Sequence, residues 1–312
     1  MNTLFFKYAL EVERTRSITQ AADNLFMAQP NLSKSIKEME DTLGFHVFER
    51  TSKGVIPTEK GHLFLEYARS VVAQLDKIDA LADSADENIQ KFSISIPRGS
   101  YISKGITRFV SELDQTMGID LNIHETNSMQ AINNLVDGKF NLAVIRYQVV
   151  YEPYFKSFLQ EKRLSADTVW EFEHLVLMSR YHKLAAQSPL KLDDLGHSIE
   201  IVHGDNVVPY LPAEKNNKDP RAAAPKKRIY LYERGNQFEL LSNIHDTFMW
   251  VSPIPRDMLE KYGLIQRKCV FQGNKYKDML VYPKGYRFSE LDKKFIDKLY
   301  EAKKEVALAE YQ

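Results

Sequence analysis

The hydrophobic and polar positions of the first 60 residues repeat with the period of helices joined by short connections. In the first predicted helix the apolar residues share one face, namely Leu4, Phe5, Tyr8, Ala9 and Val12. A second helix is predicted to begin at Ser17, because Ser17 and Gln20 have the spacing of a capping box. The third is predicted to end at Gly44 and carries a narrow apolar stripe formed by Leu32, Ile36, Met39 and Leu43. We therefore expect three short helices that pack through these faces.

After Gly44 the pattern changes to short apolar pieces. Phe45, Val47 and Phe48 lead into the stretch RTSKGVIPT, in which Ser-Lys-Gly stands between two β-like segments. Such an arrangement is typical of a small hairpin. The sequence therefore predicts a two-stranded wing directly after the third helix.

A long helix is predicted next, from Thr58 to about Asp86, where the sequence contains no proline and a single glycine. Its apolar positions form a heptad seam of Phe64, Val71 and Ile78, with Tyr67 and Leu81 between them and Gln74 as a polar interruption. A helix of roughly 40 Å, at ~1.5 Å per residue, cannot bury such a seam alone. We therefore expect a coiled-coil dimer.

From Phe92 onward the pattern alternates strands and helices. FSISIP, IDLNIH and FNLAVI are predicted strands, with helices from Ser100 and Ser128 between them. This β-α-β-α-β order predicts a parallel sheet with helices on both faces, so the fold class is α/β. Further predicted elements are the strand-like runs DTVWEFEHLVLM, SIEIV, RIYLY, DTFMWV and MLVYP and helices over 236–243 and 288–310. Residues 213–228 are polar and are expected to form a flexible loop.

The outer face of the third helix carries a distinctive set of side chains. At about 100° per residue from Leu32, the face opposite the stripe carries Pro30, Lys34, Lys37 and Asp41, flanked by Asn31 and Ser33. Hydroxyls, amides and amines in this arrangement read base edges and phosphates in the major groove of DNA. The second and third helices would then form a helix-turn-helix. The alternative interpretation is an ordinary solvated surface helix.

The charge balance does not by itself favour DNA. The 312 residues have zero net charge, and the first 62 carry equal numbers of basic and acidic side chains. The cations would have to gather on one face, as expected for Lys34, Lys37, Arg50 and Lys53.

Composition also excludes several other classes. The single cysteine, Cys269, rules out a disulfide within the chain and a cysteine-based zinc site. The sequence contains neither a run of 18 apolar residues nor a signal-peptide pattern, so we expect a cytoplasmic protein without a membrane partner. No HExxH, GxSxG, P-loop or GxGxxG pattern is in place. We therefore predict no enzyme, no catalytic or metal-binding residues and no cofactor.

The stretch SITQAADNLFMAQPNLSKSIKEMEDTLGFHVFERTSKGVIPTEKG closely resembles the N-terminal signature of the LysR-type transcriptional regulators. The matches, in order, are Ser17-Ile18, Ala21-Ala22, Gln29-Pro30-Asn31-Leu32-Ser33, Leu43-Gly44, Val47-Phe48-Glu49-Arg50 and Thr58-Glu59-Lys60-Gly61. The resemblance is tight over residues 2–62 and architectural over the rest. It implies an N-terminal all-α winged helix-turn-helix, a long linker helix, and a C-terminal two-subdomain α/β domain of periplasmic-binding-protein type.

The resemblance also implies boundaries within the chain. The DNA-binding domain would take residues 1–58, the linker and dimerisation helix 59–89, and the effector-binding domain 90–312. Subdomain I would comprise 90–162 and 268–312 and subdomain II 163–267, with the chain crossing between them near 160–168 and 264–270. DNA contact is carried over to Gln29, Pro30, Ser33, Lys34, Arg50 and Lys53, and the helical wheel adds Asn31 and Lys37.

Two residues depart from the family pattern. Ala28 stands where the family usually has serine, which removes a helix N-cap worth roughly 1 kcal/mol. Lys34 stands where arginine is frequent, and lysine cannot make a bidentate contact with guanine. Looser base reading at that position is expected.

Ligands of such folds bind where strand ends face the crevice. The candidate effector-binding residues are Ser100, Tyr101, Asn127, Ser128, Arg146, His203 and Trp250. Ser100 and Ser128 either cap their own helices or contact the ligand, and Arg146 is either an anchor for an effector carboxylate or a salt-bridged surface arginine. For the remaining rings the simpler interpretation is a loop histidine and core aromatic residues. The expected effector is a carboxylate or an aromatic metabolite.

The implied function is a sequence-specific, DNA-binding transcriptional regulator whose bound effector modulates DNA binding or activation. The expected partners are double-stranded DNA, a second copy through the linker helix, a tetramer by family analogy, and RNA polymerase. Two alternatives are a DNA-binding regulator without a ligand and a solute-binding protein without a catalytic role.

Overall fold

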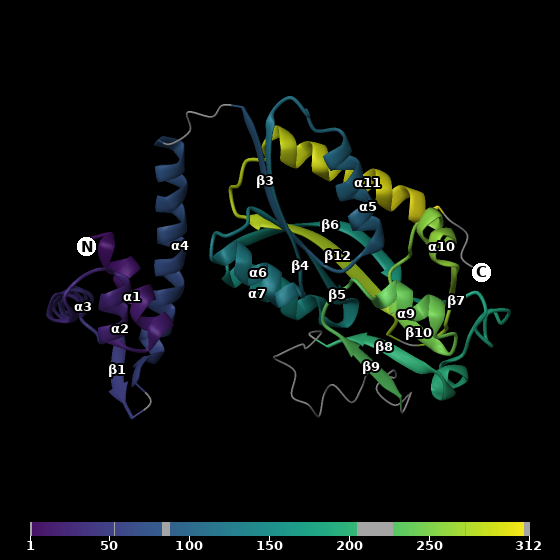
Figure 1. The fold of residues 1–312 in the computed structure, drawn as a ribbon, viewed down its shortest axis with the longest axis horizontal. Coiled ribbons are helices and arrows are strands. Elements are labelled where there is room, and N and C mark those ends of the chain that lie inside the picture. The colour runs from purple at the N-terminus through teal and green to yellow at the C-terminus, as the bar shows by residue number, and fades with distance from the viewer. Residues whose placement is uncertain (1, 53, 83–87, 205–226, 272, 309–312) are drawn as a thin grey trace. The chain divides into compact units, whose positions relative to one another are not determined.

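The computed structural model describes residues 2–52, 54–82, 88–204, 227–271 and 273–308, and the chain divides into two units (Figure 1). The first contains residues 1–87 together with 134–140, and the second contains the remainder. Most of the loop expected over 213–228 lies outside the described residues, as do Lys53 and the Leu81 side chain.

The first unit contains the predicted helices and wing. Its elements are α1 (Leu4–Thr15), α2 (Ile18–Asn24), α3 (Gln29–Leu43), the antiparallel wing strands β1 (Phe48–Thr51) and β2 (Gly54–Pro57), and α4 (Glu59–Ala82). The predicted start of α2 is confirmed, because the Ser17 hydroxyl accepts a hydrogen bond from the Gln20 amide at 3.3 Å. Gly44 ends α3 with φ of 74°, a left-handed conformation that glycine adopts without strain.

The core of this unit forms around the stripe of α3. Leu32, Ile36 and Met39 are buried against apolar residues of α1 and α2, whereas Leu43 is only half-buried. On α1 the predicted inner face is confirmed for Phe5, Ala9 and Val12, which are buried. Leu4 was placed on that face wrongly, since 47% of its surface is exposed.

The apolar seam of α4 differs in part from the predicted heptad seam. Phe64 is buried in the core of its own unit, so it is not available to a second chain. Leu63, Tyr67 and Ile78 are instead exposed at 56%, 71% and 59%. The exposed apolar stripe of α4 therefore runs through these three residues.

The second unit contains two five-stranded sheets. The first has the order β4-β3-β5-β12-β6, formed by β3 (Ile89–Ile96), β4 (Gly118–Glu125), β5 (Leu142–Gln148), β6 (Leu164–Glu173) and β12 (Lys275–Pro283). β3 pairs in parallel with β4 and β5, as predicted, but β12 is antiparallel to β5 and β6. The sheet is therefore mixed, because β12 returns from the second sheet in the opposite direction.

The second sheet has the order β11-β7-β10-β8-β9. Its strands are β7 (Leu175–Ser179), β8 (Ile199–His203), β9 (Arg228–Leu231), β10 (Thr247–Val251) and β11 (Leu264–Arg267). The chain first crosses between the sheets later than the predicted position near residues 160–168. Strand β6 stays paired with β12 through Glu173, and the crossing lies at His174. The predicted run DTVWEFEHLVLM thus contains two strands of different sheets. The chain returns between β11 and β12, over residues 268–274.

Helices cover the sheets. They are α5 (Ser100–Ser111), α6 (Ser128–Val136), α7 (Glu152–Glu161), α9 (Gln237–Asn243), α10 (Arg256–Tyr262) and α11 (Glu290–Ala307). α5 and α11 lie side by side (Figure 1), and their Phe109 and Phe295 rings pack with Phe92 of β3. This aromatic cluster packs the C-terminal half of α5 against β3 and α11.

Candidate functional site

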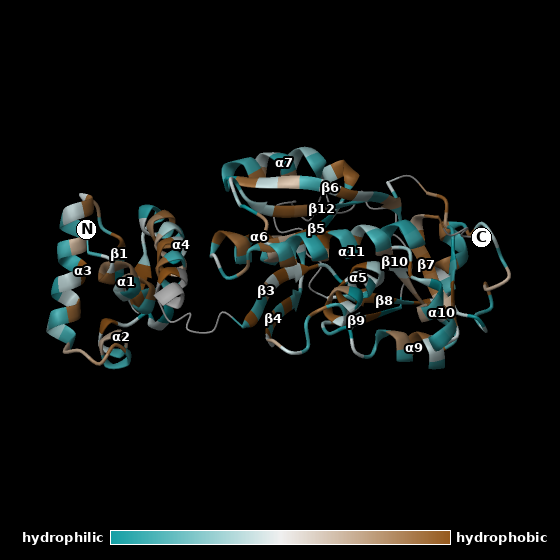
Figure 2. Ribbon diagram, turned by 90° about the horizontal axis from the view of Figure 1, so that it is seen from above, coloured by the Kyte–Doolittle hydropathy of each residue, from teal (hydrophilic) through white to brown (hydrophobic). Residues whose placement is uncertain are grey.

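The outer face of α3 is open to solvent within the first unit. Gln29, Pro30 and Asn31 are exposed in its first turn, and Ser33 is half-buried. Figure 2 shows teal polar residues along much of this helix. Ala28 provides no side-chain cap, as predicted, but its carbonyl accepts hydrogen bonds from the Asn31 N–H at 2.9 Å and the Leu32 N–H at 3.2 Å.

The basic side chains on this surface are exposed and unpaired. Among the described residues, Lys34, Lys37 and Arg50 make no salt bridge and no side-chain hydrogen bond. Unpaired, solvated cations retain their full charge for an external anion. We call this set, together with Gln29, Pro30, Asn31 and Ser33, the α3 surface.

Glu40 fixes the wing to α3, and sequence reasoning missed it. Its Oε1 accepts hydrogen bonds from the backbone N–H groups of Val47 at 2.7 Å and Phe48 at 3.0 Å. Its Oε2 lies 3.0 Å from His46 Nδ1, and this hydrogen bond raises the pKa of His46. An acidic residue on α3 six to eight positions before the wing was the available signal.

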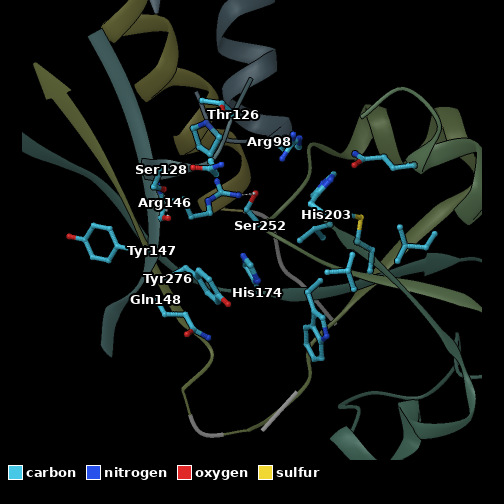
Figure 3. A pocket seen from close by; sticks show the side chains of 18 of the residues that line it. Arg98, Thr126, Ser128, Arg146, Tyr147, Gln148, His174, His203, Ser252 and Tyr276 are labelled. Carbon is cyan, nitrogen blue, oxygen red and sulfur yellow. Dashed lines mark hydrogen bonds between the residues drawn. The ribbon is translucent and has the colours of Figure 1, made fainter. Parts of the chain in front are cut away.

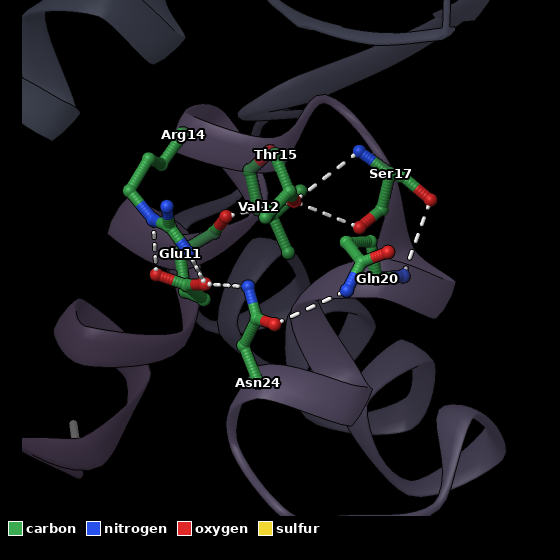
Figure 4. Close-up of polar contacts among 7 residues, drawn as sticks. All are labelled: Glu11, Val12, Arg14, Thr15, Ser17, Gln20 and Asn24. Atoms are coloured by element: carbon green, nitrogen blue, oxygen red, sulfur yellow. Dashed lines mark hydrogen bonds and ion pairs between the residues drawn. The ribbon is translucent and has the colours of Figure 1, made fainter.

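A polar network joins α1 to α2 (Figure 4). The Glu11 carboxylate accepts from Arg14 at 2.5 Å and from Asn24 at 2.6 Å, and Gln20 donates to Asn24 at 3.1 Å. The Arg14 hydrogen bond lowers the pKa of Glu11. Thr15 completes the corner by donating to the Ser17 carbonyl at 2.9 Å. These contacts set the direction of α2, on which α3 packs.

The second unit contains a cleft of about 530 Å³ whose walls come from both sheets (Figure 3). Six of the predicted effector-binding residues line it, namely Ser100, Asn127, Ser128, Arg146, His203 and Trp250. Tyr101 does not line it, because its ring is fully buried in the core of the first sheet. The lining residues that were missed include Arg98, His174, Glu200, Arg228, Gln237, Ser252 and Tyr276.

Arg146 is tied to a buried acid. Its Nε and Nη2 donate to the two carboxylate oxygens of Asp278, each at 2.7 Å, and Asp278 has no exposed surface. Nη1 donates to the Ser252 hydroxyl at 3.1 Å across the cleft, as the dashed line in Figure 3 shows. The Tyr101 hydroxyl also donates to Asp278, and burial raises the pKa of this tyrosine. Arg146 is thus salt-bridged but not at the surface.

The two candidate serines form hydrogen bonds with arginines and do not cap their helices. The Ser128 hydroxyl donates to the Arg146 carbonyl at 2.7 Å and accepts from its N–H at 2.9 Å, while Asn127 caps α6. The Ser100 hydroxyl accepts from Arg234 at 3.0 Å. Arg234 also pairs with Glu125 at 2.6 Å, which joins the region after β9 to the end of β4. Arg234 follows a predicted strand, so the strand-end rule would have selected it.

Cys269 is 3% exposed, and burial raises the pKa of its thiol to about 11. Such a thiol is inert under ordinary conditions. Over the described ranges, no group of three or more His, Cys, Asp or Glu side chains is arranged to hold a metal ion. Within the same ranges, no helix is both long and apolar enough to cross a membrane.

The first unit has the fold of a winged helix-turn-helix protein, and the second is a two-sheet α/β domain with a cleft. Residues 5–62 match the family described as "Bacterial regulatory helix-turn-helix protein, lysR family". The chain is 27% identical over 207 residues to the "Hydrogen peroxide-inducible genes activator" of Pectobacterium carotovorum, a match that covers 64% of this chain and 66% of that relative.

Two solved structures share the fold. Full-length CbnR in complex with its target DNA has a TM-score of 0.57 at 14% identity, and the match covers 97% of this chain and all of the other. Full-length LysG of Corynebacterium glutamicum with bound Arg has a TM-score of 0.56 at 16% identity, covering 97% and 98%. The lysR-family match is thus confined to the N-terminal helix-turn-helix segment, and the chain spans about two thirds or less of the length of the relatives that it matches.

Proposed function

We propose that this chain is a sequence-specific, DNA-binding regulator of transcription that acts in the cytoplasm and responds to a small molecule in the cleft of its second unit. The observation that carries the proposal is the α3 surface, where polar and basic side chains are exposed and unpaired beside a buried apolar stripe. A polyanion such as DNA is the partner that this surface suits.

In the proposed contact, the first turn of α3 enters the major groove. Gln29, Asn31 and Ser33 read base edges, Lys34, Lys37 and Arg50 contact phosphates or bases, and Lys53 would act from the wing. Glu40 holds the backbone at the start of the wing against α3, and Arg50 is proposed to reach the same duplex from β1. The likeness to CbnR, whose structure was solved with its target DNA, supports this role.

The regulator is proposed to act as a dimer through α4. The exposed stripe of Leu63, Tyr67 and Ile78 would form the seam, while Phe64 stays in its own core. Association of dimers into a tetramer and contact with RNA polymerase complete the proposal. Sedimentation of a Tyr67→Glu variant should show a monomer, whereas an unchanged mass would exclude this seam.

The cleft is proposed to hold the effector between the two sheets, with residues 90–173 and 275–312 as one subdomain and 174–274 as the other. This places the first boundary later than expected, because β6 belongs to the first sheet. A ligand that binds the closed cleft better than an open one would shift the balance between the two forms. The volume of the cleft, about 530 Å³, suits a small metabolite.

A selection experiment tests DNA binding. Duplexes that bind the full-length chain are enriched from a randomised pool, and the affinity of the selected duplex is then measured by fluorescence anisotropy. Asn31→Ala and Ser33→Ala should each lower affinity by about 1–3 kcal/mol for the selected duplex, with little change for unselected DNA. If no duplex is enriched, or both variants retain the wild-type preference, the proposal fails. Ser103→Ala in the second unit is the control.

A further inference from the structure

We propose that the cleft takes an uncharged ring compound that bears an N–H or O–H group, and that it rejects carboxylates. This inference rests on the proposed function, because it concerns the effector of the same cleft. Four observations carry it: the pairing of Arg146, the pairing of Arg228, the rings along the wall, and one buried acceptor.

The charge of Arg146 is already balanced inside the protein. Asp278 receives two hydrogen bonds from this guanidinium at 2.7 Å and is completely buried, while the Arg146 side chain is only 12% exposed. The Arg146 guanidinium also lies 4.9 Å from the centre of the Phe172 ring. A carboxylate placed beside Arg146 would therefore meet a matched pair and the repulsion of Asp278.

The other arginines of the lining are also engaged. Arg228 pairs with Glu200 at 2.8 Å, and the Glu200 side chain is only 7% exposed. Arg98 donates to the Tyr232 carbonyl at 2.9 Å. Removing a carboxylate from water costs several kcal/mol unless an unmatched cation receives it. Beside the Arg146 and Arg228 pairs, the cleft therefore offers a carboxylate too little compensation for its lost hydration.

The wall offers rings and one unused acceptor instead. His174 stacks on Tyr276 with centroids 3.6 Å apart and planes 8° from parallel, and Trp250 lines the opposite sheet. Gln237 lines the cleft and is 4% exposed, and its Oε1 accepts no hydrogen bond from any described group. A buried acceptor without a donor is costly, and rotation of the Gln237 side chain toward the cleft would let a ligand N–H or O–H satisfy it. The ligand should thus combine a flat apolar ring with a donor.

Benzamide and benzoate test the inference, because the two rings match in size and differ in charge and donor. Binding to the full-length chain is measured by thermal shift and titration calorimetry, above the usual histidine pKa of about 6.5. Benzamide should bind about tenfold or more tightly than benzoate. Gln237→Met should abolish this preference without lowering the melting temperature of the free protein, since it removes an unsatisfied acceptor. Gln160→Met, at an exposed position of α7 outside the lining, is the matched control.

A charge variant gives a second test. Asp278→Asn leaves the Arg146 charge unmatched, so the folded variant should gain affinity for benzoate. Equal or tighter binding of benzoate by the wild type would overturn the inference, as would the absence of binding by both probes. If Asp278→Asn does not fold, the Gln237→Met comparison still decides. If the wild-type chain binds DNA but prefers benzoate, only the proposed ligand class is refuted. If the wild-type chain binds neither DNA nor either probe, the proposed function is refuted.

Discussion

The α3 surface and the cleft treat their charges in opposite ways. Lys34, Lys37 and Arg50 project into solvent and, within the described residues, make no ion pair, whereas Arg146 is clamped on both oxygens of a buried aspartate. Both regions contain basic side chains at positions where a ligand is expected. The difference is that one region leaves its charges for a partner and the other neutralises them internally.

This contrast shows why the presence of an arginine does not identify an anion site. The quantity that matters is the charge left after internal pairing, together with the hydration that a ligand must lose. On the α3 surface that residual charge is positive and solvated, which suits phosphates that keep part of their hydration. In the cleft, the ion pairs of Arg146 and Arg228 leave little residual positive charge at these two arginines.

The largest expected effect is on stability, from removing the buried acid. Asp278→Ala leaves Arg146 without its counter-ion in a buried position, which should cost about 3–5 kcal/mol of unfolding free energy. Urea unfolding of the full-length chain measures this loss. The double variant Arg146→Met with Asp278→Leu should recover most of it. A loss below about 1 kcal/mol would show that the pair is not isolated from water as described.

An intermediate effect is expected on the salt dependence of DNA binding. Lys34→Ala and Lys37→Ala should each make the slope of log affinity against log salt less negative by about 0.9, because each removes one phosphate contact. Lys7, which is paired with Asp76 at 3.3 Å, provides the control: Lys7→Ala should leave the slope unchanged. Unchanged slopes for both α3 variants would mean that these lysines do not contact phosphate.

The smallest expected effect is a pH dependence at the wing. The Glu40 hydrogen bond raises the pKa of His46 above its usual value near 6.5, so protonated His46 stabilises the folded state. This contribution is fully present below the unfolded pKa and is lost as the pH rises through the folded pKa. The melting temperature of wild type should therefore exceed that of His46→Asn at low pH, and the difference should shrink as pH rises. A constant difference would exclude this linkage.

Local signals predicted the first unit well. The stripe of Leu32, Ile36 and Met39, the Ser17 cap and the Gly44 end of α3 all depend on residues within one or two helical turns. The wing followed from a short glycine-bearing turn between β-like pieces. Leu4 and Phe64 were exceptions, and for Phe64 the reason is that heptad spacing does not tell whether a seam residue faces its own domain or a second chain.

Long-range pairing limited the prediction of the cleft. Strand ends selected Arg146, but its partner Asp278 lies 132 residues later, inside the apolar run of β12. A single acid within such a run was a signal that the cation partner lies on a neighbouring strand. The boundary between β6 and β7 was missed for a similar reason, since His174 interrupts neither the apolar pattern nor the strand propensity.

The two chain crossings between the sheets are bonded to each other. The His174 N–H donates to the Asn274 carbonyl at 3.3 Å, and the Asn274 amide donates to the His174 carbonyl at 2.9 Å. The two crossings are therefore expected to act together as one hinge, about which the two sheets rotate relative to each other. Because His174 also lines the cleft, a bound molecule would contact the hinge itself.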